Sequence, residues 1–167
     1  MDRKNPQGQV ANAGWAWAGL AARLILGGVL IFAGASKTAG PTEEFAVVIE
    51  SYDVLPTDAS QTAAAFLPWL ELALGYALVF GWLTKPAAGA AGALLAAFLL
   101  AMLSTKARGI ELPNCGCFGA GFHAPLWVTM SMDALLLAGA FAAFKGGASL
   151  LSLDNWADGR YTTAHGR

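Results

Sequence analysis

Four apolar runs of membrane-spanning length limit what this chain of 167 residues can fold into. Each run contains at most one charged residue, and the four cover residues 14–36, 63–83, 86–104 and 125–144. About 20 helical residues cross the ~30 Å hydrocarbon layer of a bilayer. The charged fraction of 13% agrees, because soluble domains carry about a quarter of charged residues. The sequence therefore predicts an all-α integral membrane protein.

The predicted architecture is a four-helix transmembrane bundle in residues 1–145, followed by a polar tail in residues 146–167. The first run exceeds the length of a signal-peptide core and is interrupted by Arg23, so we expect a true first span rather than a cleaved signal. The second and third runs are joined by so short a link that they must form an antiparallel hairpin. Proline at residue 86 suits the first turn of the third helix.

The connection after the first run, residues 37–62, contains a helical pattern of its own. Gly40-Pro41 followed by two glutamates is typical of a helix start, since acids favour the positive end of the helix dipole. Apolar residues then recur at helical spacing, at Phe45, Val48, Ile49 and Tyr52. We expect a short amphipathic helix at the outer interface, acting either as a lid over a site in the bundle or as a plain interfacial anchor.

The orientation in the membrane follows from the basic residues near the spans. The side that holds both termini carries Arg3, Lys4, Lys85, Lys145 and Arg160, and the other side carries Lys37, Lys106 and Arg108. This excess predicts a multi-pass protein of the inner membrane with cytoplasmic termini. A net charge of -1 gives no electrostatic reason to expect nucleic acid as a partner.

Three charged residues lie inside the predicted spans: Arg23, Glu71 and Asp133. From the ends of the runs, Arg23 is about 13 Å deep from the inner side and the acids are about 12 Å deep from the outer side. Charges isolated in lipid are costly, so we expect Arg23 to contact Glu71 or Asp133 within the bundle. Such a cluster either fixes the helix packing or forms a polar pocket that holds the head group of a redox partner or moves protons.

The two cysteines of the chain, Cys115 and Cys117, are separated by one glycine in the loop before the last run. A zinc site needs about four ligands, and the neighbours His123 and Glu111 do not supply a convincing set, so no metal is predicted. Inert buried thiols are the second interpretation. The third, which we favour, is a reversible disulfide whose small strained ring is easily reduced, with Arg108 and His123 favouring the thiolate.

Several short segments, taken in order, resemble the methylamine utilisation protein MauE family, within the wider DoxX-like group of four-span membrane proteins. They are G-A-S-K at 34–37, Y-D-V-L-P at 52–56, L-P-W-L-E-L at 67–72, R-G at 108–109 and C-G-C-F-G at 115–119. The resemblance runs from about Arg23 to Asp133. It implies a four-helix membrane bundle that supports disulfide formation or maturation of periplasmic redox proteins with a thioredoxin-like partner.

Two functions from different classes remain open at this stage. In the first, the chain is a membrane thiol–disulfide oxidoreductase in which Cys115 and Cys117 cycle against a periplasmic redox client. In the second, it is a non-catalytic accessory subunit that packs against other membrane subunits of an electron-transfer complex, with structural cysteines. The DoxX-like resemblance adds a quinone as a cofactor to consider. A redox protein needs the cysteine pair to be reachable, whereas a packing subunit needs one face of the bundle to be covered.

Overall fold

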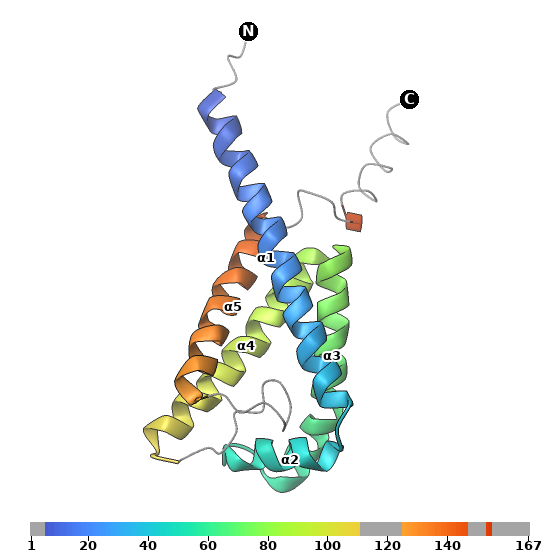
Figure 1. Ribbon diagram of the computed structural model, residues 1–167, viewed down its shortest axis with the longest axis vertical. Helices are drawn as coiled ribbons and strands as arrows, with labels where there is room; N and C mark the ends of the chain where they lie inside the picture. The colour runs from blue at the N-terminus through green and yellow to red at the C-terminus, as the bar shows by residue number, and fades with distance from the viewer. Residues whose placement is uncertain (1–5, 111–124, 147–152, 155–167) are drawn as a thin grey trace.

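The computed structural model describes residues 6–110, 125–146 and 153–154, with residues 6–16 as backbone alone. These parts of the chain form four long helices and one short helix, α2: α1 (Pro6–Thr38), α2 (Thr42–Ser51), α3 (Thr57–Phe80), α4 (Thr84–Ala107) and α5 (Leu126–Gly146). Among the described residues, α1, α3, α4 and α5 are each long and apolar enough to span a membrane. The predicted all-α, four-span fold is confirmed. Figure 1 shows these four helices side by side, with α2 across one end.

The helix ends differ from the ends of the apolar runs. Helix α1 continues through Lys37 to Thr38, α3 begins at Thr57 rather than at residue 63, and α4 continues to Ala107. An apolar run stops at the first polar residue, but a helix stops where its backbone turns. The spans therefore extend further than expected at the end of the bundle where α2 lies, and this shifts which residues lie at the same height.

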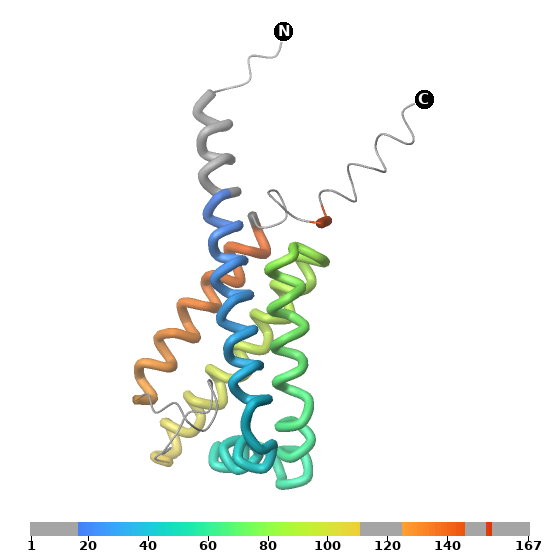
Figure 2. The backbone as a smooth tube through the Cα atoms, turned by 45° about the vertical axis from the view of Figure 1, so that its right-hand side comes forward, coloured from blue at the N-terminus to red at the C-terminus, as the bar shows by residue number. Residues whose placement is uncertain are grey.

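The predicted helical hairpin is formed by α3 and α4. Gly81 ends α3 in the left-handed conformation, with φ 67°, and Leu83 precedes α4 with φ 50°. From this shared turn α3 and α4 diverge towards the α2 end, as both views show (Figures 1 and 2). The bundle is consequently wedge-shaped between these two helices and wider at the end that α2 covers.

Helix α1 runs through the middle of the bundle, between α3 and α5, and packs most closely on α3. A Cβ atom on Gly27 would lie 2.9 Å from the carbonyl oxygen of Gly75, and one on Gly34 would lie 2.7 Å from that of Pro68. Glycine at these crossing points lets the two backbones touch, which is how helices associate when lipid removes the hydrophobic drive. The apolar core between α1, α3, α4 and α5 includes Leu26, Leu78, Ala91 and Ala143.

Helix α2 confirms the predicted short amphipathic helix. Its apolar side buries Phe45, Ala46 and Ile49 against the end of the bundle, and the following Tyr52 is buried as well. Glu43 and Glu44 occupy its first turn, as expected for the positive end of a helix dipole. The bundle therefore has a lid of secondary structure at one end.

Candidate functional site

A buried ion pair joins the end of α1 to the middle of α3. The Nζ atom of Lys37 donates hydrogen bonds to both carboxylate oxygens of Glu71, at 2.7 Å and 2.8 Å. The two side chains are only 1% and 3% exposed. Two opposite charges removed from solvent hold each other strongly, because neither has water to replace the partner. The pair therefore adds a polar link between α1 and α3 inside the bundle.

Aromatic rings from two other helices close over the ammonium group of Lys37. Its Nζ atom lies 5.3 Å from the ring centroid of Phe45 on α2 and 5.8 Å from that of Phe98 on α4. Both distances lie within the ~6 Å range of cation–π attraction. The lid helix α2 therefore contacts the buried charge directly, and four elements of the fold meet around one lysine.

Asp133 of α5 lines a small cavity together with the Lys37–Glu71 pair. A cavity of about 30 Å³ is lined by Lys37, Glu71 and Asp133 together with apolar residues of α1, α4 and α5. A single water needs roughly 10–15 Å³ of such space and two to four polar partners. The cavity can hold one or two waters among a lysine and two carboxyl groups. Two of the three charged residues that the sequence analysis singled out, Glu71 and Asp133, thus line one cavity, together with Lys37.

The structure does not bring Arg23 to this pocket. Gly34 lies at the height of Pro68 and Leu72, which flank Glu71, whereas Arg23 precedes Gly34 by eleven residues on the same helix, or about 16 Å. Glu71 is therefore paired with Lys37 rather than with Arg23, and the other half of the prediction, a contact between Arg23 and Asp133, stays a prediction. The estimate of depth failed because α1 and α3 are staggered, with α3 beginning further out beside α2.

Arg23 instead lies towards the end of the bundle opposite α2, where its charge acts on Asp154 from beyond α5. The Asp154 carboxylate accepts hydrogen bonds from the backbone N–H groups of Leu83, at 2.8 Å, and Thr84, at 2.7 Å. Burial alone would raise the pKa of Asp154, but the bonds from Thr84 and Leu83 and the charge of Arg23 outweigh it, so its pKa is lowered. Asp154 thus caps α4 from the chain's tail, a contact that the sequence analysis missed.

The spacing of residues along α1 could have identified Lys37 as a buried residue of the bundle. Residues 23, 26, 30, 33 and 37 are among the buried positions of α1 and follow one another at helical spacing, so Lys37 continues a buried stripe. Glu71 occupies the corresponding stripe of α3 with Pro68, Gly75 and Leu78. The apolar run ends one residue before Lys37, so the sequence analysis counted Lys37 as a loop residue and did not consider it as a partner of Glu71.

A larger, apolar cavity lies beside the polar pocket, in the wedge between α3 and α4 under α2. Its volume is about 250 Å³. The two cavities share Leu94 and Phe98 of α4 as a common wall. The rest of the lining comes from three helices and the turn after α2: Phe45, Ile49, Tyr52, Val54, Leu55, Ala63, Leu67, Ala97 and Ala101. An apolar chamber and a water-sized polar chamber are therefore separated by two side chains.

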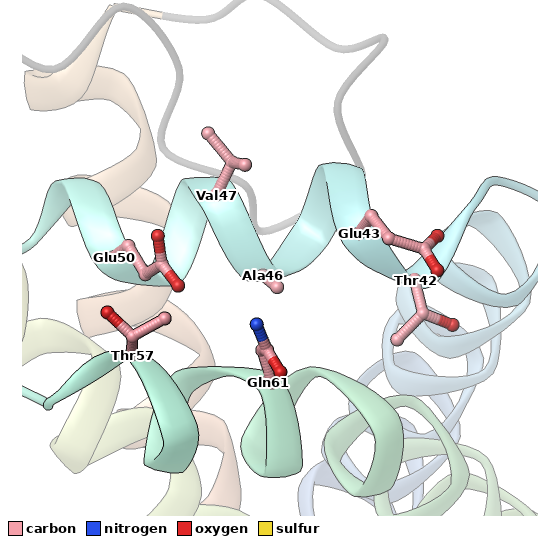
Figure 3. A pocket seen from close by; sticks show the side chains of 7 residues that line it. All are labelled: Thr42, Glu43, Ala46, Val47, Glu50, Thr57 and Gln61. Carbon is pink, nitrogen blue, oxygen red and sulfur yellow. The ribbon is translucent and has the colours of Figure 1, made fainter.

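The other side of α2 borders an acidic groove of about 360 Å³ between α2 and the first turns of α3. Figure 3 shows Glu43 with Thr42 at one end of this groove and Glu50 facing Thr57 at the other. The Gln61 amide of α3 points towards Ala46 in the middle. Helix α2 thus presents an acidic side to this groove and an apolar side to the cavity beneath it.

Arg108, which the sequence analysis placed near the cysteines, ties the end of α4 to the turn after α2. Its guanidinium group donates to the backbone oxygens of Tyr52 and Asp53 and pairs with the Asp53 carboxylate at 3.1 Å. Asp53 has φ 51°, and these bonds hold that turn in its left-handed conformation. A role of Arg108 in favouring a thiolate stays a prediction.

Cys115, Cys117 and His123 lie outside the described residues, which stop at Ile110 and resume at Pro125. Both of these flanking ends are at the α2 end of the bundle (Figure 1). Within the described ranges no three His, Cys, Asp or Glu side chains come close enough to hold a metal ion. The chemistry of the cysteine pair therefore stays a prediction from the sequence.

Comparison with known proteins agrees with the resemblance seen in the sequence. The model of the family described as methylamine utilisation protein MauE matches residues 15–146. Two proteins named methylamine utilization protein MauE are 37% identical over 127 residues, in Paracoccus denitrificans, and 38% identical over 124 residues, in Paracoccus versutus. The matches cover 75% and 74% of this chain and 68% and 66% of those proteins. No solved structure matches the chain significantly.

Proposed function

The chain belongs to the MauE family, and we propose that it serves methylamine utilisation as an inner-membrane thiol–disulfide redox protein. In this proposal Cys115 and Cys117 exchange a disulfide with a thioredoxin-like protein or a periplasmic redox client. One observation carries the proposal: both cysteines of the chain fall in the connection between α4 and α5, whose ends lie beside the lid helix α2. A pair separated by one glycine closes a small ring, and strained disulfides exchange readily.

The buried position of Lys37 supports the proposed orientation, with the cysteines in the periplasm. Lys37 belongs to a membrane-spanning helix and is paired within the bundle, so it no longer counts among the basic residues of the outer loops. The outer side then keeps Lys106 and Arg108, while the inner side keeps all of its basic residues. The excess of positive charge on the side of the termini is larger than the sequence alone indicated, which favours cytoplasmic termini.

Trapping of a mixed disulfide tests the proposal. When one cysteine attacks a client, the second normally resolves the adduct, so Cys117→Ser should leave Cys115 bound to its client, or Cys115→Ser should trap Cys117. Non-reducing electrophoresis of membranes from cells grown on methylamine would show the adduct, and mass spectrometry would identify the client. The Cys115→Ser, Cys117→Ser double variant is the matched control. If that double variant still supports growth on methylamine, the redox proposal is overturned.

An accessory role in a membrane complex is the second candidate, because of a groove on the face that α4 and α5 share. The groove measures about 230 Å³ and is lined by Gly89 and Gly92 beside Phe141 and Phe144. Small residues in such a groove permit close approach of another transmembrane helix. Gly92→Leu should then release a co-purifying subunit while leaving the cysteines reactive, whereas the redox proposal requires no subunit on this face.

A further inference from the structure

We propose that the apolar cavity under α2 holds one acyl chain of a phosphatidylethanolamine molecule, whose head group binds at the mouth of the cavity between Arg108 and Asp53. The site joins an apolar chamber between membrane-spanning helices to a pair of opposite charges at the α2 end. A phospholipid with a zwitterionic head group has the same two parts in the same order. The inference stands on this geometry and is independent of the cysteine chemistry.

The size and lining of the cavity fit hydrocarbon. Ten of its eleven lining residues have side chains without a polar atom, and Tyr52 is the exception. Engineered apolar cavities of ~150 Å³ stay dry and bind small apolar molecules instead of water. At about 250 Å³ this cavity has room for part of one acyl chain. Hydrocarbon in the chamber restores the van der Waals contacts that its lining would otherwise lack.

The position of the cavity gives a lipid chain a route from the bilayer. Helices α3 and α4 are both long and apolar enough to span a membrane, and they diverge from their shared turn towards the α2 end (Figure 2). Ala97 of α4 lines the cavity and is itself exposed, as are Val54 and Leu55 at the α2 end. An acyl chain can therefore enter between α3 and α4 while the rest of the lipid stays in its leaflet.

The turn after α2 places two opposite charges at the mouth of this chamber. Tyr52 and Val54 line the cavity, and Asp53 between them has a side chain that is 81% exposed. Arg108 of α4 reaches the same turn and pairs with the Asp53 carboxylate at 3.1 Å. Arg108 follows the lining residue Ala101 by seven positions on the same face of α4, or about 10 Å along the helix. The charged pair therefore lies beyond the chamber towards the end of the span, where an inserted lipid has its head group.

The charged pair can bind both ends of a phosphoethanolamine group. The Nη1 atom of Arg108 donates to the backbone oxygen and the carboxylate of Asp53, and Nη2 donates to the backbone oxygen of Tyr52. Among the described residues, the second Nη2 hydrogen has no acceptor, and 37% of the Arg108 side chain is exposed, so this N–H can donate to a phosphate oxygen. The exposed carboxylate of Asp53 keeps lone pairs for an ammonium group.

The head group determines which lipid is bound, because hydrocarbon gains little by leaving a bilayer for an equally apolar chamber. The ammonium of phosphoethanolamine offers three N–H donors to Asp53, whereas the trimethylammonium of a choline head group offers none. A phosphoglycerol head group carries no cation, so its phosphate meets Asp53 without a compensating charge. We therefore expect phosphatidylethanolamine to bind more tightly than phosphatidylcholine or phosphatidylglycerol with the same acyl chains.

A phosphatidylethanolamine with a photoreactive diazirine on one acyl chain tests the site on the full-length protein in detergent. We expect light-dependent labelling of the 94–101 segment of α4, located by mass spectrometry. Unlabelled phosphatidylethanolamine should compete with this labelling about fivefold better than phosphatidylcholine or phosphatidylglycerol, which is the upper range for an exposed charge pair. Equal competition by the three lipids would show an unselective lipid groove and overturn the proposal.

Two matched substitutions on α4 check the location of the acyl chain. Ala97→Phe fills the chamber, whereas Ala90→Phe adds the same ring two turns away on the same exposed face. Labelling should fall about tenfold in Ala97→Phe and stay unchanged in Ala90→Phe, with thermal unfolding recorded to confirm that both variants are folded. Unchanged labelling in a folded Ala97→Phe protein would place the lipid elsewhere and overturn the site.

A second pair of substitutions checks the head-group contact. Asp53→Asn removes the charge that the ammonium meets, and asparagine tolerates the left-handed conformation that residue 53 adopts, with φ 51°. The preference for phosphatidylethanolamine over phosphatidylcholine should disappear in this variant. Glu44→Gln removes another exposed carboxylate, near the start of α2, and should keep the full preference. A preference that survives in a folded Asp53→Asn protein would overturn the assignment of the head group to this pair.

Discussion

The ammonium group of Lys37 lies within 2.8 Å of both carboxylate oxygens of Glu71, in a setting where neither side chain meets solvent. Helix α1 supplies the cation, α3 the anion, and α2 and α4 the rings that enclose them. One pair thereby links the lid to three of the four spans. The same pair borders both the polar pocket and the wall of the apolar cavity.

The first prediction concerns the coupling of this pair. Lys37→Met alone leaves a buried carboxylate without its counter-ion and should destabilise the bundle by about 3–5 kcal/mol. Adding Glu71→Gln removes the orphaned charge and should restore most of the loss, because a buried pair replaced as a whole is often close to neutral. Unfolding of the single and double variants in mixed micelles measures the coupling energy. Additive losses would show that the two residues act independently.

The sequence predicted the fold well and the charge pairing poorly, and the reasons are physical. Four apolar runs specify four spans because only helices satisfy their backbone inside lipid. Pairing depends on the heights of the helices, and heights depend on where Gly27, Gly34 and Gly75 let α1 and α3 touch. No run length records that stagger, so the sequence offered Glu71 or Asp133 as the partner of Arg23, whereas Glu71 pairs with Lys37.

Asp154 shows a second kind of limit. The Asp154 carboxylate caps the start of α4 by accepting hydrogen bonds from backbone N–H groups. Because every residue type except proline offers such a group, the sequence of the polar tail does not indicate this contact. The short helix α2 was predictable because its pattern is local, with acids at its start and apolar residues at helical spacing. Local patterns are visible in sequence, whereas contacts between distant segments require the fold.

The second prediction concerns the contact between α1 and α3. Gly34→Ala places a methyl group 2.7 Å from the Pro68 carbonyl oxygen, a contact that only a backbone shift can relieve. We expect a loss of about 1–3 kcal/mol, the usual cost of overpacking. Gly28→Ala, on the same helix with nothing within 4 Å of its Cβ atom, is the matched control and should be neutral or slightly stabilising. Thermal unfolding in detergent compares the two, and equal effects would refute the close packing.

The third prediction concerns the pH dependence of the Asp154 cap. Its pKa in the folded protein is lowered from the ordinary value of 3.8, so the stabilisation it gives is complete above that value and is lost as pH falls through the lower folded pKa. Asp154→Ala should reduce stability at neutral pH by about 0.5–2 kcal/mol, the cost of losing a helix cap. The difference between parent and variant should shrink as the pH falls below about 4. A difference that stays constant with pH would show that the carboxylate charge is not involved.

The fourth prediction concerns topology and joins the fold to the proposed chemistry. By sequence, most basic residues near the spans fall on the side that holds the termini, so the native cysteines should face the periplasm and Lys85, in the first turn of α4, should face the cytoplasm. After reduction, a membrane-impermeant maleimide should label the native pair in intact spheroplasts. Lys85→Cys on the Cys115→Ser, Cys117→Ser background should be labelled only after lysis. The reverse pattern would place the pair in the reducing cytoplasm, where a disulfide-forming role fails because thiols there are kept reduced.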